Sequence, residues 1–568
     1  MSQERPFTDR LLDHLDVTYR VAERDLARIP RKSPVVVVVN HPFGIPEGAV
    51  LATVLARVRP DVKFLANGIL CLIPEVRDLL IPVDPLRSTQ SNRSGLWQSI
   101  ELLRLGGLLV VFFAGAVSHF QWRRHGITDP ERNPAIARMI EIAARRGVPP
   151  AVMPVFVNGS NSALFQIAGL LHPRLRTALL ARELLNKRRQ VVELRIGSPI
   201  PGEKLLAIPS DKERTEYLRW RTYLLANRQE YKAQTSLPWS GPPAGHAGIR
   251  AGVFRRMPAR TPAWQARGPL HPSEELAHEI GSISPDLLLA RSGDLGVYLA
   301  PAERIPKLLA EIGRLREITF RAAGEGTGRP TDLDHFDAHY LHLFVWNANA
   351  KEIVGAYRLV GTEVGTKNLY TPTRFKYGDA FLAKMGPALE LGRSFVRPEY
   401  QKGFAPLLLL WKGIGKYVAQ NPKYKTLFGP VSISNQYKSI SRELMITFLE
   451  RHASLREWLG LVSNRNPFRR RRAVKPAFPS SGFDIEDLSD VVTDLEASRA
   501  GVPVLLRQYL RLGGKLLGFN VDPEFADALD GLILVDLTRT EPNLLDRYLG
   551  KTEAAQFLVF QKGSHATQ

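Results

Sequence analysis

The first half of the chain alternates short apolar runs with longer stretches in which apolar residues recur every three or four positions. Four apolar runs predict buried strands, at residues 35–39, 108–113, 151–157 and 191–196. Four stretches show helical periodicity, at residues 11–29, 49–58, 96–105 and 134–146. Strands that alternate with helices predict an α/β domain, which we expect over residues 1–235.

The composition changes after residue 235. Residues 236–272 are rich in proline and glycine with scattered arginines, which is typical of a linker. A second unit is expected over residues 273–568, with predicted strands at 340–345, 353–359, 391–396 and 427–431 and predicted helices at 302–320 and 404–418. A length of 568 residues also exceeds what one hydrophobic core normally holds. The expected fold class is therefore α/β with two domains.

The charge balance points to anionic partners. The chain holds 77 Lys and Arg against 56 Asp and Glu, a net charge of +21, which suits nucleic acid, a phospholipid surface or an acidic carrier protein. The basic residues lack regular aromatic interleaving and no nucleic-acid module is evident, so nucleic acid is not expected. The arginine run, expected to contact membrane, consists of Arg469, Arg470, Arg471 and Arg472.

The expected cellular location rests on the cysteine count and on the absence of a signal peptide or a membrane-spanning run. The single cysteine, Cys71, excludes an internal disulfide and fits a reducing compartment. The first 16 residues have no signal-peptide core, and no run approaches the roughly 18 apolar residues that span a bilayer. We therefore expect a cytoplasmic protein that is peripheral on the inner face of the cytoplasmic membrane.

The first predicted strand ends in a candidate catalytic histidine. Asn40-His41-Pro42-Phe43-Gly44 follows residue 39 directly, and a carboxylate comes soon after at Glu47. A histidine beside a carboxylate acts as a general base on an alcohol, because the carboxylate fixes its tautomer and stabilises the imidazolium. Taken alone, a structural loop histidine remains the alternative.

Three later segments strengthen this interpretation. They are Ile-Pro-Val-Asp-Pro at 81–85, Val-Phe-Phe-Ala-Gly-Ala-Val-Ser at 111–118 and Met-Pro-Val-Phe-Val-Asn-Gly at 153–159. With the histidine block, they resemble the four-block pattern of the glycerophospholipid acyltransferase family over residues 30–205. The resemblance implies acyl transfer to a lysolipid hydroxyl, with His41 as base and Glu47 as its orienting carboxylate. The residues that it implies for substrate binding are Asn40, Phe43, Gly44, Gly115, Ser118 and Asn158.

The chain departs from this family at three positions. Pro46 occupies the family's aspartate position, Ala114 replaces its third-block glutamate, and Ala116 follows Gly115. The glycerol-phosphate pocket is therefore in doubt. His-Pro-Phe-Gly with a displaced acid looks more like the O-acyltransferase module of ornithine-lipid synthases.

A second set of motifs lies in the second half. Residues 390–400 read Glu-Leu-Gly-Arg-Ser-Phe-Val-Arg-Pro-Glu-Tyr, with 334–337 and 354–359 upstream and 411–417 downstream. Together they are similar to the GNAT-like long-chain N-acyltransferases that make lyso-ornithine lipid. Amide formation needs a neutral amine, so a carboxylate beside the acceptor is expected, with Glu390 as the candidate base. The similarity implies that Arg393 and Arg358 bind the substrate and that Gln401, Lys402 and Gly403 bind the acyl donor; a surface ion pair of Glu390 and Arg393 is the alternative.

Two other signals are weaker. His335, His339 and His342 have a spacing that suits zinc on a helix, but the predicted strand 340–345 would scatter them, so no metal is expected. The glycine-rich stretch 324–328 lacks the Lys-Ser/Thr of a phosphate-binding loop, which favours a substrate loop.

These observations favour a fused bifunctional acyltransferase that makes an amino-acid lipid, with ornithine as the favoured head group. The second domain would N-acylate the amino acid with a 3-hydroxyacyl chain, and the first would O-acylate that hydroxyl. The expected donors are acyl-carrier-protein or CoA thioesters, with no other cofactor. The expected partners are an acyl carrier protein, an anionic membrane surface, and the amino-acid and lyso-lipid substrates.

Two alternatives remain open at this point. One is a lysophospholipid acyltransferase with an accessory GNAT-like domain. The other is a non-enzymatic membrane-binding protein with degraded acyltransferase domains, which Ala114 and Ala116 would favour.

Overall fold

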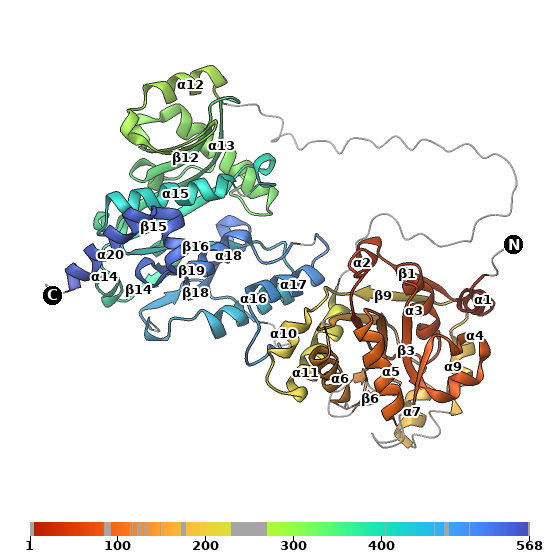
Figure 1. Cartoon of the computed structure of the whole chain (residues 1–568). Helices are drawn as coiled ribbons and strands as arrows, with labels where there is room; N and C mark the ends of the chain where they lie inside the picture. The colour runs from red at the N-terminus through yellow and green to blue at the C-terminus, as the bar shows by residue number, and fades with distance from the viewer. Residues whose placement is uncertain are drawn as a thin grey trace, which may run out of the picture. The chain divides into compact units, whose positions relative to one another are not determined.

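A computed structural model describes most of the chain in two compact units (Figure 1). The residues it leaves undescribed are 1–4, 85–91, 114, 116, 122–125, 131–133, 148, 172–177, 229–269, 404, 459, 471–475, 499 and 566–568. The first unit comprises Met1–Arg250 and Lys475–Gly501, and the second comprises Ala251–Val474 and Val502–Gln568.

The first unit is built on a seven-stranded mixed sheet in the order β1-β9-β8-β2-β5-β3-β4. The five strands from β8 to β4 are mutually parallel, whereas β9 runs antiparallel to β8 and parallel to β1. The strands are β1 (Thr18–Val21), β2 (Val35–Val39), β3 (Val62–Asn67), β4 (Leu80–Val83), β5 (Leu108–Phe112), β8 (Ala151–Asn158) and β9 (Val191–Ile196). A separate hairpin pairs β6 (His119–Gln121) with β7 (Gly126–Thr128).

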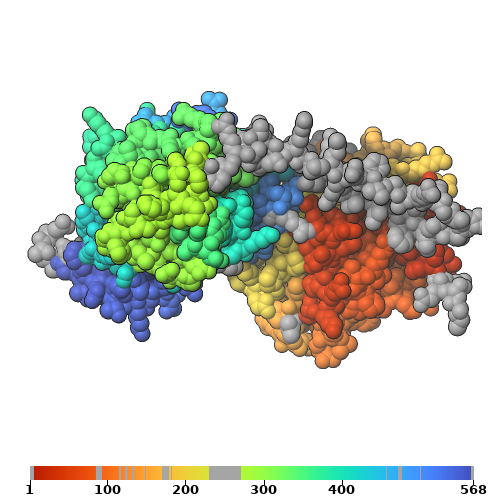
Figure 2. Space-filling model, turned by 90° about the horizontal axis from the view of Figure 1, so that it is seen from above, coloured from red at the N-terminus to blue at the C-terminus, as the bar shows by residue number. Residues whose placement is uncertain are grey.

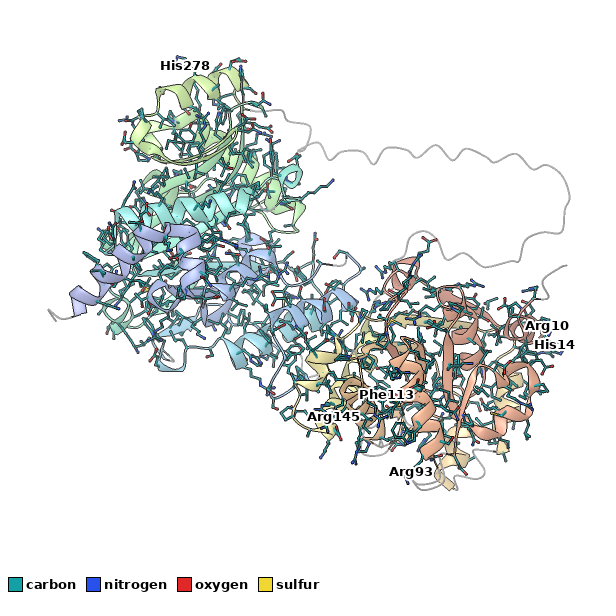
Figure 3. All side chains as sticks on the ribbon, viewed as in Figure 1. Arg10, His14, Arg93, Phe113, Arg145 and His278 are labelled. Carbon is teal, nitrogen blue, oxygen red and sulfur yellow. The ribbon has the colours of Figure 1, made fainter. Side chains whose placement is uncertain are left out.

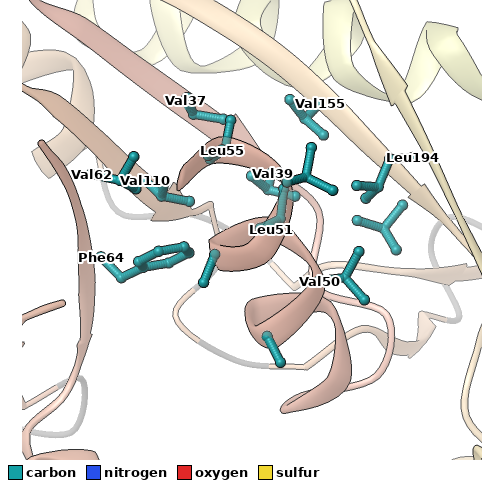
Figure 4. Packing of buried hydrophobic residues seen from close by; sticks show 14 of the residues in the cluster. Val37, Val39, Val50, Leu51, Leu55, Val62, Phe64, Val110, Val155 and Leu194 are labelled. Atoms are coloured by element: carbon teal, nitrogen blue, oxygen red, sulfur yellow. The ribbon is translucent and has the colours of Figure 1, made fainter. Parts of the chain in front are cut away.

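All five residues of β2 are buried, as expected for a central strand with helices on both faces. The helix that follows it, α3 (Pro46–Ala56), begins with proline at its first turn and buries nine of its eleven residues. Leu51 and Leu55 of α3 pack near Val37 and Val39 of β2 (Figure 4). This packing fixes the direction of the β2–α3 loop, which carries His41.

The other helices of this unit are short. They are α1 (Phe7–His14), α2 (Glu23–Leu26), α4 (Pro74–Arg77), α5 (Arg93–Arg104), α6 (Ala135–Arg145), α7 (Ala163–Leu171), α9 (Leu180–Asn186), α10 (Gly202–Leu206), α11 (Asp211–Leu224) and α17 (Ile485–Leu495). The predicted helix over 11–29 is wrong. The chain turns at Asp16, whose φ is +51°, and then enters β1, because residues 18–21 pair with β9 at the sheet edge.

The second unit contains an eight-stranded sheet in the order β10-β11-β12-β13-β15-β16-β19-β18. Every neighbouring pair is antiparallel except β15 and β16, which are parallel. The strands are β10 (Leu288–Ser292), β11 (Leu295–Pro301), β12 (Leu341–Asn347), β13 (Glu352–Gly361), β15 (Ala388–Val396), β16 (Thr426–Ile433), β18 (Lys515–Asp522) and β19 (Ala528–Asp536). A separate two-stranded sheet pairs β14 (Phe375–Tyr377) with β17 (Val462–Asn464).

Helices cover both faces of this sheet. The core against α13 (Pro306–Ala322) includes Phe344 and Phe395, whereas Trp411 of α15 (Ala405–Gln420) contacts Tyr357. α12 (Ser273–Ser282) packs beside α13 and lies at the surface of the unit, in yellow-green in Figure 2. The remaining helices are α14 (Ala380–Met385), α16 (Ser439–His452), α18 (Val504–Arg511), α19 (Pro542–Leu549) and α20 (Lys551–His565). The expected α/β class with two domains is confirmed.

The domain division differs from the sequence expectation at residues 475–501. The sequence suggested one unbroken unit from 273 to 568, but this segment belongs to the first unit. The reason is a buried carboxylate on α17: Asp494, 3 % exposed in its side chain, accepts hydrogen bonds from Arg28 at 2.7 Å and Arg221 at 3.2 Å. Its backbone carbonyl accepts one from Arg228 at 2.6 Å. The expected linker 236–272 lies mostly outside the described residues.

Candidate active sites

The first candidate site lies at the carboxyl end of β2, the central strand of the seven-stranded sheet. In open α/β sheets, ligands bind at this edge. The Nδ1 atom of His41 is 2.9 Å from Oε1 of Glu47, so the structure brings together the two residues that the sequence paired. The His41 side chain is 16 % exposed and its ring lies 4.3 Å from that of Phe112. Because Glu47 occupies Nδ1, Nε2 is the nitrogen left for a substrate proton.

Glu47 is held by the loop that it orients. Its Oε1 also accepts hydrogen bonds from the backbone N–H groups of Phe43, at 2.9 Å, and Gly44, at 2.8 Å. Complete burial opposes its ionisation, but the hydrogen bond and charge of His41 and these two N–H groups outweigh burial and lower the pKa of the Glu47 carboxyl. A permanently charged carboxylate at Nδ1 is what a histidine base requires.

A second buried carboxylate, Asp129, supports the same loop, and the sequence analysis missed it. Its Oδ1 accepts from the backbone N–H of His41 at 3.2 Å and from the hydroxyl of Ser118 at 2.5 Å. The backbone N–H of Ser118 in turn donates to the His41 carbonyl at 2.7 Å. Asp129 resembles a helix-start residue in the sequence, but α6 begins six residues later, at Ala135. No local pattern announces this long-range contact.

The remaining predicted residues of the first site have mainly structural contacts. Asn40 joins β2 to β8 through two hydrogen bonds with the backbone of Val157, at 2.9 and 2.7 Å. The ring of Phe43 is buried against Gly159, where a Cβ atom would lie 2.3 Å from the ring. Asn158 donates to Glu193 at 3.1 Å on the surface.

The two loop glycines fit their predicted positions in the backbone. Gly44 has a φ of +114° and Gly115 a φ of +60°, which glycine adopts without steric cost. Gly115 is exposed. Ala114 and Ala116, where the chain departs from the family pattern, lie outside the described residues.

The second candidate site lies where β15 and β16 separate. The two strands pair through only three residue pairs, from Ala388–Thr426 to Glu390–Phe428, although they are nine and eight residues long. Beyond this point the edge of β15 that faces β16 has no ladder partner among the described strands. Main-chain groups left unpaired in this way can bind an extended substrate chain, as an added strand would bind.

Arg393 lies in this separated part of β15, on a β-bulge. Opposite Tyr357 of β13 stand two residues, Arg393 and Ser394, and Arg393 has a φ of +50°. A non-glycine residue in this backbone region is strained, and such strain concentrates at functional sites. The Arg393 guanidinium lies between the rings of Tyr370, at 5.1 Å, and Phe525, at 4.9 Å. Its position fits the predicted substrate-binding role.

Glu390 has a different environment from the one expected of a base. Its side chain is 1 % exposed, and its oxygens accept hydrogen bonds from the backbone N–H groups of Tyr370, at 2.9 Å, and Thr371, at 2.7 Å, and from the Tyr340 hydroxyl. A carboxylate enclosed by three donors holds the 370–371 backbone and has no free geometry for an incoming amine. The sequence placed a carboxylate on the correct strand, but this geometry favours a structural role for it.

The two terminal nitrogens of Arg358 are also engaged by carboxylates. It is 1 % exposed and pairs with both oxygens of Asp334, at 2.6 and 3.0 Å, and with Asp337 at 3.2 Å. These carboxylates occupy both terminal nitrogens, and the remaining Nε is buried without a hydrogen-bond partner. The predicted substrate role of Arg358 would therefore need the Asp334 pair to open. The three histidines considered for zinc have separate contacts: Nε2 of His339 with the Asn368 carbonyl, Nε2 of His342 with the Asp337 carbonyl, and the ring of His335 with Phe336.

The predicted donor-binding turn precedes α15. Gln401, Lys402 and Gly403 are exposed, and the Gln401 amide donates to the Val396 carbonyl at 2.7 Å. The turn thus links the end of β15 to the start of the helix, where backbone N–H groups are available to a phosphate. Of the arginine run, Arg469 and Arg470 are exposed and Arg470 pairs with Glu450, while Arg471 and Arg472 lie outside the described residues.

Two carboxylates near Arg393 were missed by the sequence analysis. Burial raises the pKa of Glu325 to about 7. Burial, with the charges of Asp522 and Glu325, raises the pKa of Asp530 to about 8. Glu325 belongs to the glycine-rich stretch 324–328, where a substrate loop was expected, so a signal existed for one of them. Asp530 lies inside a strand, where nothing in the local pattern singles it out.

Comparison with known proteins assigns a domain to each half. A family model described as acyltransferase matches residues 3–231, and one described as acetyltransferase (GNAT) domain matches residues 315–412. The glycine N(alpha)-acyltransferase of Bacteroides thetaiotaomicron is 35% identical over 260 residues, which cover 42% of this chain and 76% of that protein. The chain belongs to the same acyltransferase family as this relative. It is therefore an acyltransferase, with an N-terminal acyltransferase domain and a C-terminal GNAT domain.

Two further relatives have names that state their amino-acid acceptor. The glycine N(alpha)-acyltransferase of Phocaeicola vulgatus is 33% identical over 260 residues, covering 42% of this chain and 79% of that protein. The L-ornithine N(alpha)-acyltransferase of Brucella abortus is 25% identical over 280 residues, covering 46% of this chain and 91% of that protein. Relatives of this acyltransferase thus carry the names of two different amino-acid acceptors.

Proposed function

We propose that this acyltransferase makes a doubly acylated amino-acid lipid. The second unit N-acylates the amino acid with a 3-hydroxyacyl chain, and the first unit O-acylates the hydroxyl of that chain. The observation that carries the proposal is the presence of two independent candidate sites, the His41–Glu47 pair in one unit and Arg393 at the separated β15–β16 pair in the other. The matches of two different acyltransferase families to the two halves support it.

For O-acylation, His41 acts as general base. Its Nε2 takes the proton of the acceptor hydroxyl as the oxygen attacks the thioester carbonyl, and the imidazolium is stabilised by Glu47. The proton then passes to the departing thiolate, so that an ester and a free thiol are formed. Asp129 keeps the His41 backbone in place through its contact with the His41 N–H.

For N-acylation, Arg393 binds the carboxylate of the amino acid and the separated strand β15 receives the acyl donor. Ornithine was the head group expected from the sequence, and glycine is a second candidate because the relatives of higher identity carry its name. The donor is a thioester of acyl carrier protein or CoA, and the net charge of +21 suits either anionic donor.

The lipid product requires contact with a membrane surface. Within the described part of the chain, no helix is long and apolar enough to span a bilayer. Exposed apolar residues instead follow the carboxyl ends of three parallel strands, at the edge that carries His41: Ile45 after β2, Ile69, Leu72 and Ile73 after β3, and Leu164 and Ile167 after β8. Exposed cations lie on other parts of the surface of the same unit, among them Arg10 of α1, Arg93 of α5 and Arg145 of α6 (Figure 3). We propose that this apolar edge rests on an anionic bilayer.

Lipid mass spectrometry of cells that express the chain tests the proposal. The expected product is an amino acid that carries an amide-linked 3-hydroxyacyl chain and a second, ester-linked chain. An altered phospholipid acyl profile without an amino-acid lipid would instead support a lysophospholipid acyltransferase with an accessory GNAT domain. Absence of any new lipid, with both units folded, would contradict both activities.

A further inference from the structure

Two acidic side chains, the half-buried Glu325 and the buried Asp530, lie within electrostatic range of Arg393, and neither has an ion-pair partner among the described residues. Glu325 follows α13 and accepts a hydrogen bond from the hydroxyl of Ser432, at 2.9 Å. Ser432 lies in the part of β16 that no longer pairs with β15, and it is the cross-strand partner of Asp530 in β19. Glu325 therefore lies near Asp530, whose pKa its charge raises, beside the opening between β15 and β16.

Asp530 is the more unusual of the two. It is 5 % exposed, and among the described residues no group donates a hydrogen bond to its carboxylate or lies within ion-pair distance of it. The charged groups around it are Asp522, Glu325, Arg374 and Arg393. Of these, Arg374 is already paired, at 2.9 Å with Asp522 and at 3.0 Å with Glu524. A charged carboxylate buried without a partner is costly, so such a group either holds a proton or pairs with a cation.

Arg393 lies at the same opening and is a largely buried cation, whereas Asp530 is a buried acid. Its guanidinium makes no hydrogen bond within the described residues, and its contacts with carboxylates are long, 3.4 Å to Asp332 and 3.8 Å to Asp334. Its side chain is only 12 % exposed. The guanidinium presents N–H donors in a planar fork, and this fork matches the two oxygens of a carboxylate ligand.

We propose that Arg393 and the Glu325–Asp530 pair are the two ends of one receptor for a zwitterionic α-amino acid, with the carboxylate on Arg393 and the amino group on the two acids. The inference rests on the proposed N-acylation by the second unit and adds the residues that bind and deprotonate the amine. It moves the role of base away from Glu390, which is enclosed by its own donors.

The proton balance of the reaction fits this arrangement. The ammonium group gives one proton to Glu325 or Asp530 and becomes a nucleophilic amine. The amine attacks the thioester carbonyl, the C–S bond breaks, and the second proton lost from nitrogen goes to the thiolate. An amide, a thiol and one protonated carboxyl result, and the carboxyl then releases its proton to water. Raised pKa values, about 7 for Glu325 and about 8 for Asp530, suit carboxyls that must hold a proton near neutral pH.

The experiment uses the full-length protein and measures N-acylation of glycine and of ornithine with a 3-hydroxyacyl thioester. Asp530→Asn and Glu325→Gln are each expected to raise KM for the amino acid at least tenfold and to flatten the pH profile of kcat/KM between about 6 and 9. Asp527→Asn is the matched control, because Asp527 is exposed and lies only three residues before Asp530; it should behave as the wild type.

A substrate series tests the other end of the receptor. The wild type should prefer the amino acid over its methyl ester by at least tenfold, and Arg393→Gln should lose that preference. Wild-type KM and pH profile in both Asp530→Asn and Glu325→Gln would overturn the inference while leaving N-acylation intact. A wild type that forms no N-acyl amino acid at all would instead overturn the proposed function. Circular dichroism of each variant confirms folding before it is assayed.

Discussion

The Oε1 atom of Glu47 lies 2.9 Å from Nδ1 of His41 and 2.8 Å from the backbone nitrogen of Gly44. Glu47 stands six residues after His41, in the first turn of α3, one place beyond the aspartate position of the resembled family. Pro46 begins the helix, and the turn that follows directs the displaced carboxylate back to the histidine.

This geometry predicts how the first unit responds to substitution. His41→Ala should lower O-acylation by about 10²–10⁴-fold, since the general base is lost. Glu47→Gln should be milder, because an amide still contacts Nδ1 but no longer stabilises the imidazolium. Rates of ester formation on a supplied lyso-lipid measure both. Equal loss in the two variants, with unchanged folding, would show that Glu47 does more than orient His41.

Glu390→Gln distinguishes a structural from a catalytic role. The carboxylate accepts from two backbone N–H groups and a tyrosine hydroxyl, whereas an amide presents a single acceptor oxygen and adds an NH₂ donor. We expect the variant to lose about 1–3 kcal/mol of unfolding free energy, as is usual when buried hydrogen bonds are left unmade. Its pH profile of N-acylation should keep the wild-type shape. A profile that loses its basic limb, with wild-type stability, would restore Glu390 as the base.

Stability of the second unit should depend on pH through Glu325 and Asp530. Their pKa values, about 7 and about 8 in the folded protein, lie above the ordinary values of 4.5 and 3.8. The folded protein therefore binds more protons than the unfolded chain, so these groups make the free energy of unfolding fall as pH rises from about 4 to about 8.

Urea unfolding at pH 5 and pH 8 measures this effect. The decrease between the two pH values should be smaller in Asp530→Asn than in the wild type, whereas Asp527→Asn should not change it. An unchanged decrease in Asp530→Asn would show that Asp530 does not hold its proton in the folded state.

Asp494 should be essential to the first unit, although it lies late in the chain. Asp494→Ala leaves the guanidinium groups of Arg28 and Arg221 without their buried partner, which typically costs about 3–5 kcal/mol. Chemical denaturation monitored on the first unit measures it, with Glu216→Gln, at an exposed position on α11, as control. The same contacts predict that a fragment beginning at residue 273 exposes the apolar side of α17 and is prone to aggregate. A soluble, stable fragment would contradict this.

Membrane contact through the apolar edge gives a separate prediction. Replacing Ile69 and Leu72, 66 % and 76 % exposed, by serine should weaken binding to anionic vesicles without lowering stability. Charge reversal at Arg469 and Arg470 should also weaken it, by about 1 kcal/mol for each residue near the surface. Vesicle sedimentation at two salt concentrations separates the two contributions. Affinity that ignores the serine substitutions would exclude this edge as the contact surface.

Much of the architecture follows from local patterns. The predicted bounds of β2, β5, β8 and β9 match the structure within one residue. β2, β5 and β8 are buried on both faces and have a continuous apolar signal, whereas β9 is buried at alternate residues. The His41–Glu47 contact was also predictable, since both residues lie within one loop and one helical turn. By contrast, β1 was hidden within a predicted helix, since an edge strand of four residues depends on its partner β9.

The parts that the sequence could not predict depend on distant segments. Asp129 and Asp530 act through neighbours far along the chain. The segment with α17 belongs to the first unit through the buried Asp494 and through aromatic contacts of Phe478 and Phe483 with Trp220. Glu390 differs from these missed residues, because the sequence singled it out as a base and the structure gives it structural contacts. Its motif placed a carboxylate on the correct strand, but only the fold shows that the backbone at 370–371 already occupies it.

The most direct test of two-step lipid synthesis is a time course with purified full-length protein, amino acid and 3-hydroxyacyl and acyl thioesters on anionic vesicles. In the wild type, the mono-acylated amino acid should form first and then convert to the doubly acylated lipid. In His41→Ala, the mono-acylated product should accumulate at the wild-type initial rate and remain. Formation of the doubly acylated lipid by His41→Ala, at a rate close to that of the wild type, would contradict the assignment of O-acylation to the first unit.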